Sequence, residues 1–217
     1  KNSPHELWSL SKSFTSTAVG FAVNEGLLSI DDLVISFFPD KVPKKPSWQL
    51  EQLRIVDLLT MNTGHVKEPK LNAGEGDWEF NFLNSDIQFM PGTHFLYNTP
   101  ATFMLSSIIQ KVSGEMLVDY LYPRLFEPLG IEKPDWEMNE AGVNVGGWGL
   151  HLKTEDIAKF GLLYLNKGMW NGKQILPKKW IENATSKQVS NGSNPSNDWT
   201  QGYGYQFWRS RHNSYRG

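Results

Sequence analysis

The sequence predicts an α+β fold in which mainly the helical part is present and the antiparallel sheet is incomplete. Six or seven segments carry helical patterns, whereas only one or two short segments have strand patterns. So many helices with so little sheet do not make a self-sufficient layered fold. The composition is that of a globular protein, with 39% hydrophobic and 20% charged residues among 217. We therefore expect residues 1–217 to form one partial domain whose remaining strands lie in flanking sequence.

The first half of the chain is expected to hold three helices and one long loop. Residues 9–26 form a largely buried helix with a glycine stop. A capping-box pattern predicts a short second helix over 29–39, which a proline ends. Apolar residues at helical spacing predict the third helix over 53–61. Residues 64–84 lack sustained periodicity, so we interpret them as a flap over a cleft.

The second half starts with the clearest helix of the sequence, over 99–114. Thr99 followed by Pro100 has the pattern of a helix cap with proline at the first helical position. Further helices are expected over 116–125, 154–168 and 177–184, strands over 173–176 and 203–208, and a polar loop over 191–197. The second strand, Tyr203–Trp208, has no visible partner, so its edge is expected to be unpaired.

Charge and composition restrict the partners. The formal net charge is −2 and the Lys and Arg residues are scattered, so no basic surface is predicted that would attract nucleic acid. No apolar run approaches the roughly 18 residues of a membrane helix. Cysteine is absent, which excludes disulfides, thiolate zinc sites and a cysteine nucleophile but leaves the compartment open. A small-molecule or peptide substrate is the partner that we expect.

Ser9 and Lys12 form a Ser-x-x-Lys pattern at the start of the first helix. Side chains three residues apart lie on one helix face, so the lysine amine can reach the serine hydroxyl. A serine is a weak nucleophile until a base takes its proton, and a lysine serves as that base when burial lowers its pKa. The pattern alone is short, and a capped surface helix is its ordinary alternative. It occurs once in this chain.

Four segments, taken in order, resemble one family of serine hydrolases. Residues 7–15, LWSLSKSFT, are similar to the nucleophile segment of class C β-lactamases, D-alanyl-D-alanine peptidases and related esterases. Residues 57–65, DLLTMNTGH, resemble the family segment LLTHTSG, and residues 91–99, PGTHFLYNT, resemble PG-x-x-F-x-Y-S-N. Residues 146–161 resemble GG-x-x-S-T-x-x-D-x-x-R-F-G. The resemblance covers about residues 5–210.

The resemblance implies a β-lactamase/transpeptidase-like fold and acyl transfer without metal or cofactor. Ser9 would be the nucleophile, Lys12 its base with a lowered pKa, and Tyr97 a second proton carrier. Trp148 would lie in the cleft and contact the substrate. The substrate class stays open among β-lactams, peptides, amides and esters. Many relatives act outside the cytoplasm, so a periplasmic or secreted location is expected, although no signal peptide is visible.

Two departures from the family pattern affect the site. Thr99 stands where the family usually has the asparagine that binds a substrate carbonyl. No Lys-Thr-Gly or His-x-Gly strand follows before Gly217, and that strand supplies the second oxyanion-hole amide in the family. We therefore expect the N-terminal strands and this third-motif strand to be missing from the segment. Its unpaired edge at 203–208 would favour self-association.

Other functions fit the sequence less well. The rival within the family is a penicillin-binding sensor or scaffold domain that acylates without turnover. The five histidines show no i,i+4 pair of the kind that binds zinc in a helix, and no isolated pair of carboxylates suits glycosidase chemistry. His212 lies among arginines in a predicted exposed turn, so we do not expect it to form a catalytic triad.

Overall fold

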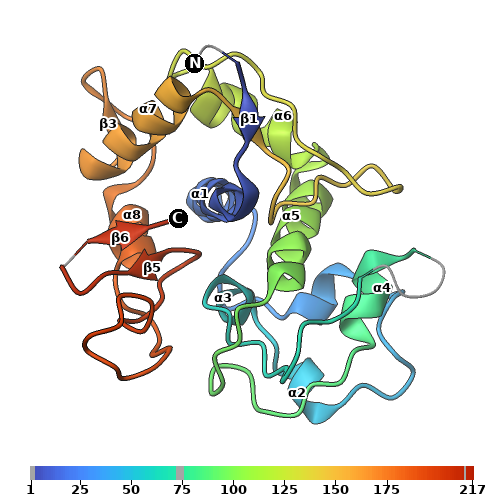
Figure 1. The fold of residues 1–217 in the computed structure, drawn as a ribbon. Coiled ribbons are helices and arrows are strands. Elements are labelled where there is room, and N and C mark those ends of the chain that lie inside the picture. Colours follow the sequence, from blue (N-terminus) through green and yellow to red (C-terminus); the bar gives the residue numbers. More distant parts are fainter. Residues whose placement is uncertain (1–2, 72–75, 213) are drawn as a thin grey trace.

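Helix α1 (Ser11–Asn24) lies at the centre of the molecule and is seen nearly along its axis in Figure 1. The computed structural model describes residues 3–71, 76–212 and 214–217. Every residue of α1 from Ser11 to Ala22 is buried, although many are serines and threonines. Most of their hydroxyls find hydrogen-bond partners inside the core, although Ser16 Oγ has none among the described residues; Thr17 Oγ1, for example, donates to Ser13 O at 2.9 Å. The predicted first helix is thereby confirmed.

Helices pack on α1 from both sides. On one side lie α5 (Thr99–Ser113) and α6 (Leu117–Leu121), and on the other lie α7 (Thr154–Leu165) and α8 (Lys178–Thr185). The Phe14 ring of α1 stacks on Phe160 of α7 with centroids 3.9 Å apart. A Cβ at Gly20 would lie 2.5 Å from Trp180 Nε1. Glycine therefore lets α8 pack directly on the backbone of α1.

Shorter helical elements complete the helical part of the fold. They are 3₁₀ turns η1 (Trp8–Leu10) and η2 (Val34–Phe37), helices α2 (Trp48–Glu51), α3 (Ile55–Leu59) and α4 (Trp78–Leu83), and the π-helical η3 (Tyr122–Phe126). Both α3 and α4 pack against α5. Helix α3 begins where the Asp57 carboxylate accepts the Arg54 N–H at 2.9 Å, as a capping box does.

Within the described residues, each strand is two residues long, and the strands form three antiparallel pairs. Strand β1 (His5–Glu6) pairs with β2 (His151–Leu152), β3 (Met169–Trp170) with β4 (Lys173–Gln174), and β5 (Trp208–Arg209) with β6 (Tyr215–Arg216). The first pair joins the start of the chain to the segment before α7, next to the end of α1 that carries η1 (Figure 1). The predicted α+β class is confirmed, with helices predominating.

Gln206 joins the three helices α1, α3 and α5. Its amide nitrogen donates to Leu58 O at 3.0 Å and Leu59 O at 2.9 Å in α3, and its amide oxygen accepts Thr102 Oγ1 of α5 at 2.7 Å. Its backbone oxygen accepts Ser13 Oγ of α1 at 3.2 Å. The residue is buried and has a φ of 66°. A left-handed conformation in a glutamine is unfavourable, so these hydrogen bonds must offset its strain.

The prediction of a continuous strand over Tyr203–Trp208 is wrong. The chain turns back within it, since Gly204 N donates to Phe207 O at 2.8 Å, and Tyr203 bridges both Val189 and Trp208. The expectation of an unpaired strand is also wrong here, because Trp208 continues into β5 and pairs with β6. The alternating aromatics follow a turn that Gln206 anchors.

Three further predictions need correction. The expected helix over 29–39 forms only the turn η2, because Leu33 is extended and bridges Arg54. The flap over 64–84 contains α4, which Asp77 caps by accepting the Phe80 N–H at 2.9 Å. Asn98, and not Thr99, caps α5. Residues 72–75 of the flap lie outside the described part of the chain.

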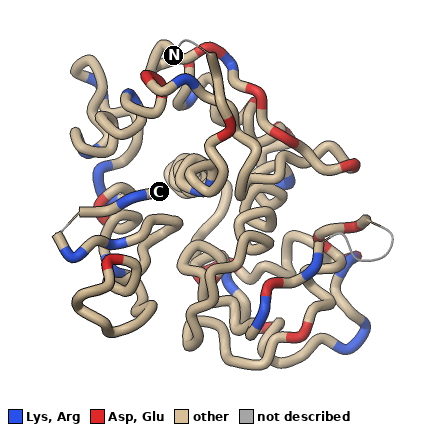
Figure 2. The backbone as a smooth tube through the Cα atoms, viewed as in Figure 1, with Lys and Arg blue, Asp and Glu red and all other residues tan. Residues whose placement is uncertain are grey.

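The surface carries interspersed charges. Figure 2 shows Lys, Arg, Asp and Glu residues scattered along the tube, separated by stretches without charge. Within the described ranges, no helix is both long and apolar enough to cross a membrane. Charge effects at any one site are therefore local, and they depend on the individual neighbours described below.

Candidate active site

Ser9 and Lys12 meet at the end of α1 that follows η1. Ser9 lies in the 3₁₀ turn and is exposed, whereas Lys12 lies in the first turn of α1 and is 2% exposed. Lys12 Nζ donates to Ser9 Oγ at 3.1 Å and to Gly147 O at 2.8 Å. The preceding residue, Trp8, has a φ of 47°, so the chain enters the turn in a left-handed conformation.

Burial changes the protonation of Lys12. Removal of the ammonium from water lowers the pKa of Lys12 to about 8, and the nearby Glu68 carboxylate opposes this by raising it. At pH 7 about one-tenth of the Lys12 side chains are then neutral amines, far more than for a lysine in water. A neutral amine beside a serine hydroxyl can accept its proton.

Tyr97, which precedes α5, reaches the same point from the other side. Its phenol hydrogen-bonds with Ser9, and Lys12 Nζ lies 5.1 Å from the centroid of its ring. Rings of Trp208 and Tyr203 lie against it, with centroids 5.2 and 6.3 Å away. Burial raises the pKa of Tyr97, although the bond with Ser9 lowers it. The side chain is therefore a neutral phenol at pH 7.

The segment Gly146–Gly147 presents two successive carbonyls to α1. Lys12 binds Gly147 O, and Thr15, one turn along α1, donates to Gly146 O at 2.8 Å. Asn144 fixes this segment, because its Oδ1 accepts Val118 N at 3.1 Å and its backbone oxygen accepts Ser106 Oγ at 2.6 Å. Asn144 thus ties the backbone segment that holds the Lys12 amine to α5 and α6.

Thr99 lies beside this segment, with its side-chain methyl against Gly147. It is the first residue of α5, and a Cβ at Gly147 would lie 2.7 Å from Thr99 Cγ2 and 3.5 Å from Lys12 Nζ. Thr99 N donates to Glu68 Oε1 at 2.6 Å. The Thr99 methyl therefore packs against the Gly147 backbone, next to the Lys12 amine.

Trp148 is half-buried next to the site. Its Nε1 donates to Glu137 Oε2 at 3.2 Å, and its ring stacks on Trp78 of α4 with centroids 6.1 Å apart. The two indoles and Thr99 line a cavity of about 270 Å³ together with Pro69, Lys70, Leu71 and Pro100. The structure thus brings Trp148 to a cavity that adjoins the Ser9, Lys12 and Tyr97 cluster through Thr99.

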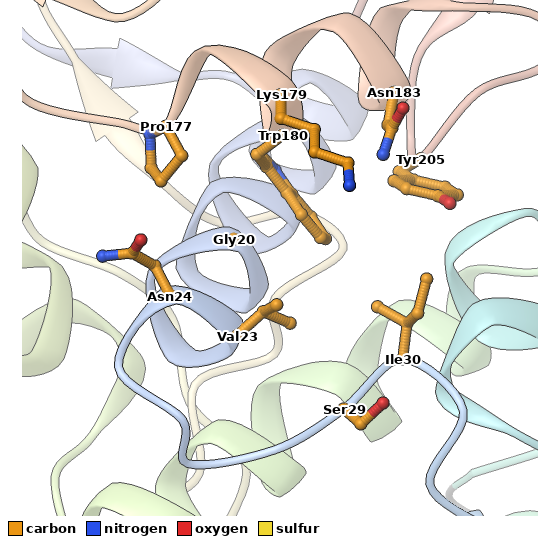
Figure 3. Close-up of a pocket in the computed structure, with 10 residues that line it drawn as sticks. All are labelled: Gly20, Val23, Asn24, Ser29, Ile30, Pro177, Lys179, Trp180, Asn183 and Tyr205. Atoms are coloured by element: carbon orange, nitrogen blue, oxygen red, sulfur yellow. The ribbon is translucent and has the colours of Figure 1, made fainter.

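A second cavity, of about 290 Å³, lies away from these residues. Figure 3 shows its lining residues: Val23 and Asn24 come from the far end of α1, and Trp180 comes from α8. None of the five residues that the sequence singled out lines it. The site is therefore placed by the Ser9, Lys12 and Tyr97 contacts and not by the Figure 3 cavity.

Sequence reasoning missed Glu68, Gly147 O and Trp78. Glu68 and Trp78 lie in the segment interpreted as a flap over a cleft, where no periodicity marks a single functional side chain. A backbone carbonyl leaves no residue-type signal either. Only the fold shows that these groups surround Lys12 and Thr99.

Two curated relatives and one solved structure illustrate what the chain resembles. An uncharacterised protein of Alkalihalophilus pseudofirmus is 26% identical over 205 residues, which are 86% of this chain and 55% of that protein. The 6-aminohexanoate-dimer hydrolase of Paenarthrobacter ureafaciens is 24% identical over 199 residues, 82% of this chain and 50% of that protein. The octameric penicillin-binding protein homologue from Pyrococcus abyssi has 24% identity and a TM-score of 0.69, covering 95% of this chain and 53% of that one.

The likeness to the Pyrococcus abyssi structure is one of fold. The chain spans about half the length of the curated relatives it matches. The sequence profile of the family described as Beta-lactamase matches residues 1–217, the whole chain. The resemblance seen in the four sequence segments is thereby confirmed, and the chain belongs to the β-lactamase family.

Proposed function

We propose that the protein is a serine hydrolase that acts through an acyl-serine intermediate on an amide, ester or β-lactam. The observation that carries this proposal is the 3.1 Å contact between Lys12 Nζ and Ser9 Oγ, together with the lowering of the Lys12 pKa to about 8. A base poised near neutral pH at hydrogen-bond distance from a hydroxyl is what nucleophilic catalysis requires.

In the proposed reaction, Ser9 Oγ attacks the substrate carbonyl carbon while the neutral Lys12 amine takes the hydroxyl proton. The tetrahedral intermediate then collapses. The leaving group takes the proton from Lys12, either directly or by way of the Tyr97 phenol, which is hydrogen-bonded to Ser9. Water attacks the acyl-serine in the second half, and the same groups return the proton to Ser9. The Ser9 N–H is one donor to the oxyanion of the tetrahedral intermediate.

The cavity beside Thr99 and Trp148 suits the apolar part of a substrate. It has about 270 Å³ and is walled by two indoles, which supply large apolar contact areas. Thr99 offers a hydroxyl where the family usually has an amide, so carbonyl binding there is expected to be weaker than with asparagine. The relative named 6-aminohexanoate-dimer hydrolase makes short linear amides reasonable first substrates to assay.

The test is covalent labelling. A fluorophosphonate or a labelled penicillin should add one adduct to the wild-type protein, and intact-mass spectrometry should find no adduct on Ser9→Ala. Ser193→Ala, which removes an exposed hydroxyl from the polar loop, is the matched control and should label normally. Undiminished labelling of Ser9→Ala would disprove the proposal. Labelling without turnover of amides or esters would instead favour the sensor or scaffold reading.

A further inference from the structure

The segment after α3 is anchored in the core and carries Glu68 to the site. Gly64 O accepts the N–H groups of Gln88 at 3.1 Å and Phe89 at 2.9 Å. His65 is 1% exposed, and its ring nitrogens bond Thr63 Oγ1 at 2.8 Å and Ser85 Oγ at 2.7 Å. Glu68, three residues later, is exposed. Its backbone therefore departs from a fixed point, which limits where its side chain can reach.

The Glu68 carboxylate is bound to the start of α5. Its Oε1 accepts the Thr99 N–H at 2.6 Å. The first N–H groups of a helix lack partners within the helix, and a carboxylate is favoured there by the helix dipole. Asn98 Oδ1 accepts the next available donor, Ala101 N, at 3.2 Å. Glu68 and Asn98 together fix the end of α5 that follows Tyr97.

The charge of Glu68 acts on both proton-carrying groups of the site. It raises the pKa of Lys12 against the dominant effect of burial, and it adds to the effect of burial in raising the pKa of Tyr97. Among the described residues, Glu68 is the carboxylate whose charge acts on both Lys12 and Tyr97. The other titratable neighbour is Tyr203, which lies behind the Tyr97 ring. Lys12 otherwise faces the neutral Ser9 hydroxyl and the Gly147 carbonyl.

We propose that Glu68 is a positioning residue of this site. Through the Thr99 N–H it holds the start of α5 against Gly147, and it places one negative charge beside the Lys12 and Tyr97 pair. A Cβ at Gly147 would lie 2.7 Å from Thr99 Cγ2, and the Gly147 carbonyl accepts the Lys12 amine. Movement of Thr99 would therefore disturb the residue that positions Lys12. The inference deepens the proposed hydrolase function and rests on it. It assigns Glu68 no contact with the reacting atoms.

Two variants separate the charge of Glu68 from its hydrogen bond. Glu68→Gln removes the charge but keeps an oxygen that can accept the Thr99 N–H. Glu68→Asp keeps the charge but is shorter by one methylene, so it withdraws from Thr99. Glu132→Gln is the matched control, because its carboxylate is 90% exposed and bonds only Lys153 among the residues the structure describes.

The first measurement is an NMR titration of the Lys12 side chain. Glu68→Gln should move the midpoint of Lys12 downward from about 8, whereas Glu132→Gln should leave it in place. The second is the rate of acylation by a fluorophosphonate against pH, whose acidic limb should move downward with the Lys12 midpoint. Glu68→Asp should instead lower the plateau rate and move the midpoint less than the Gln variant does.

A Lys12 midpoint in Glu68→Gln equal to that in Glu132→Gln would overturn the electrostatic part of the proposal. A plateau rate in Glu68→Asp equal to that of the wild type would overturn the positioning part. If the wild type were not acylated at all, the proposed hydrolase function would fail. The NMR titration would still decide whether Glu68 acts on Lys12, so the two failures are distinguishable.

Discussion

Replacing Lys12 by methionine should stabilise the fold at neutral pH while it abolishes acylation. Lys12 is 2% exposed, and burial lowers its pKa from 10.5 to about 8. Each tenfold change in proton affinity is about 1.4 kcal/mol, so the buried ammonium is disfavoured by about 3 kcal/mol relative to water. Methionine fills a similar volume without this charge. It leaves Gly147 O without its donor, which costs about 1–3 kcal/mol. The net gain at pH 7 is about 0–2 kcal/mol.

The pH dependence isolates the effect of charge. Because the folded-state pKa of Lys12 is lowered, the wild-type penalty is complete below pH 8 and disappears as the pH rises to 10.5. The difference in unfolding free energy between Lys12→Met and the wild type should therefore fall by about 3 kcal/mol from pH 7 to pH 10.5. Only the loss of the hydrogen bond to Gly147 O remains at the higher pH.

Urea unfolding followed by tryptophan fluorescence measures this difference at both pH values. Lys178→Met, at a side chain that is 60% exposed, is the matched control and should show no comparable pH dependence. If the difference in unfolding free energy between Lys12→Met and the wild type does not change with pH, the reasoning is refuted. Such a result would mean that Lys12 titrates like a lysine exposed to water.

Three other changes test the surroundings of the site. Tyr97→Phe should slow Ser9 acylation by about 10²–10⁴-fold, measured as the single-turnover labelling rate, with little change in melting temperature. Gly147→Ala should destabilise by about 1–3 kcal/mol in urea, since its methyl would lie 2.7 Å from Thr99 Cγ2; unchanged stability would show that the wall yields. Burial lowers the pKa of His65 to about 4, so the free energy of unfolding should fall as the pH drops from 6.5 to 4. His65→Gln should remove part of that loss, measured by acid unfolding. An equal loss in the variant and the wild type would contradict this prediction.

Sequence reasoning predicted the helices whose signals are local. The cap and proline around Thr99 and the glycine after α1 depend only on neighbouring residues, and α5 and α1 were found within a residue or two. Helix α4 was missed because six residues among glycines and charges give too short a window for periodicity. The two-residue strands β1 and β2 have no pattern at all, because they depend on pairing across 147 positions for His5↔Leu152 and 145 for Glu6↔His151.

The residues of the candidate site also differ in whether local sequence patterns could predict their contacts. Ser9 and Lys12 lie one helical turn apart, so their 3.1 Å contact could be predicted from spacing. The approach of Tyr97 was predicted only through family resemblance. Glu68 could not be predicted, because its partner Thr99 is 31 residues away and no residue type marks an acceptor for a backbone N–H. Long-range contacts to backbone atoms are what sequence patterns leave out.

The Gln206 junction has a consequence for synthesis on the ribosome. Its bonds reach back 104 residues to Thr102, 148 to Leu58 and 193 to Ser13. Closing such long loops is entropically costly and slow, and a growing chain lengthens by only about 5–20 residues per second. During translation, α1, α3 and α5 must therefore wait tens of seconds, at the slower rates, before residue 206 emerges to join them. In that interval the hydroxyl-rich α1 lacks its final partners, so nascent chains stalled before residue 206 should be the form that chaperones and proteases recognise.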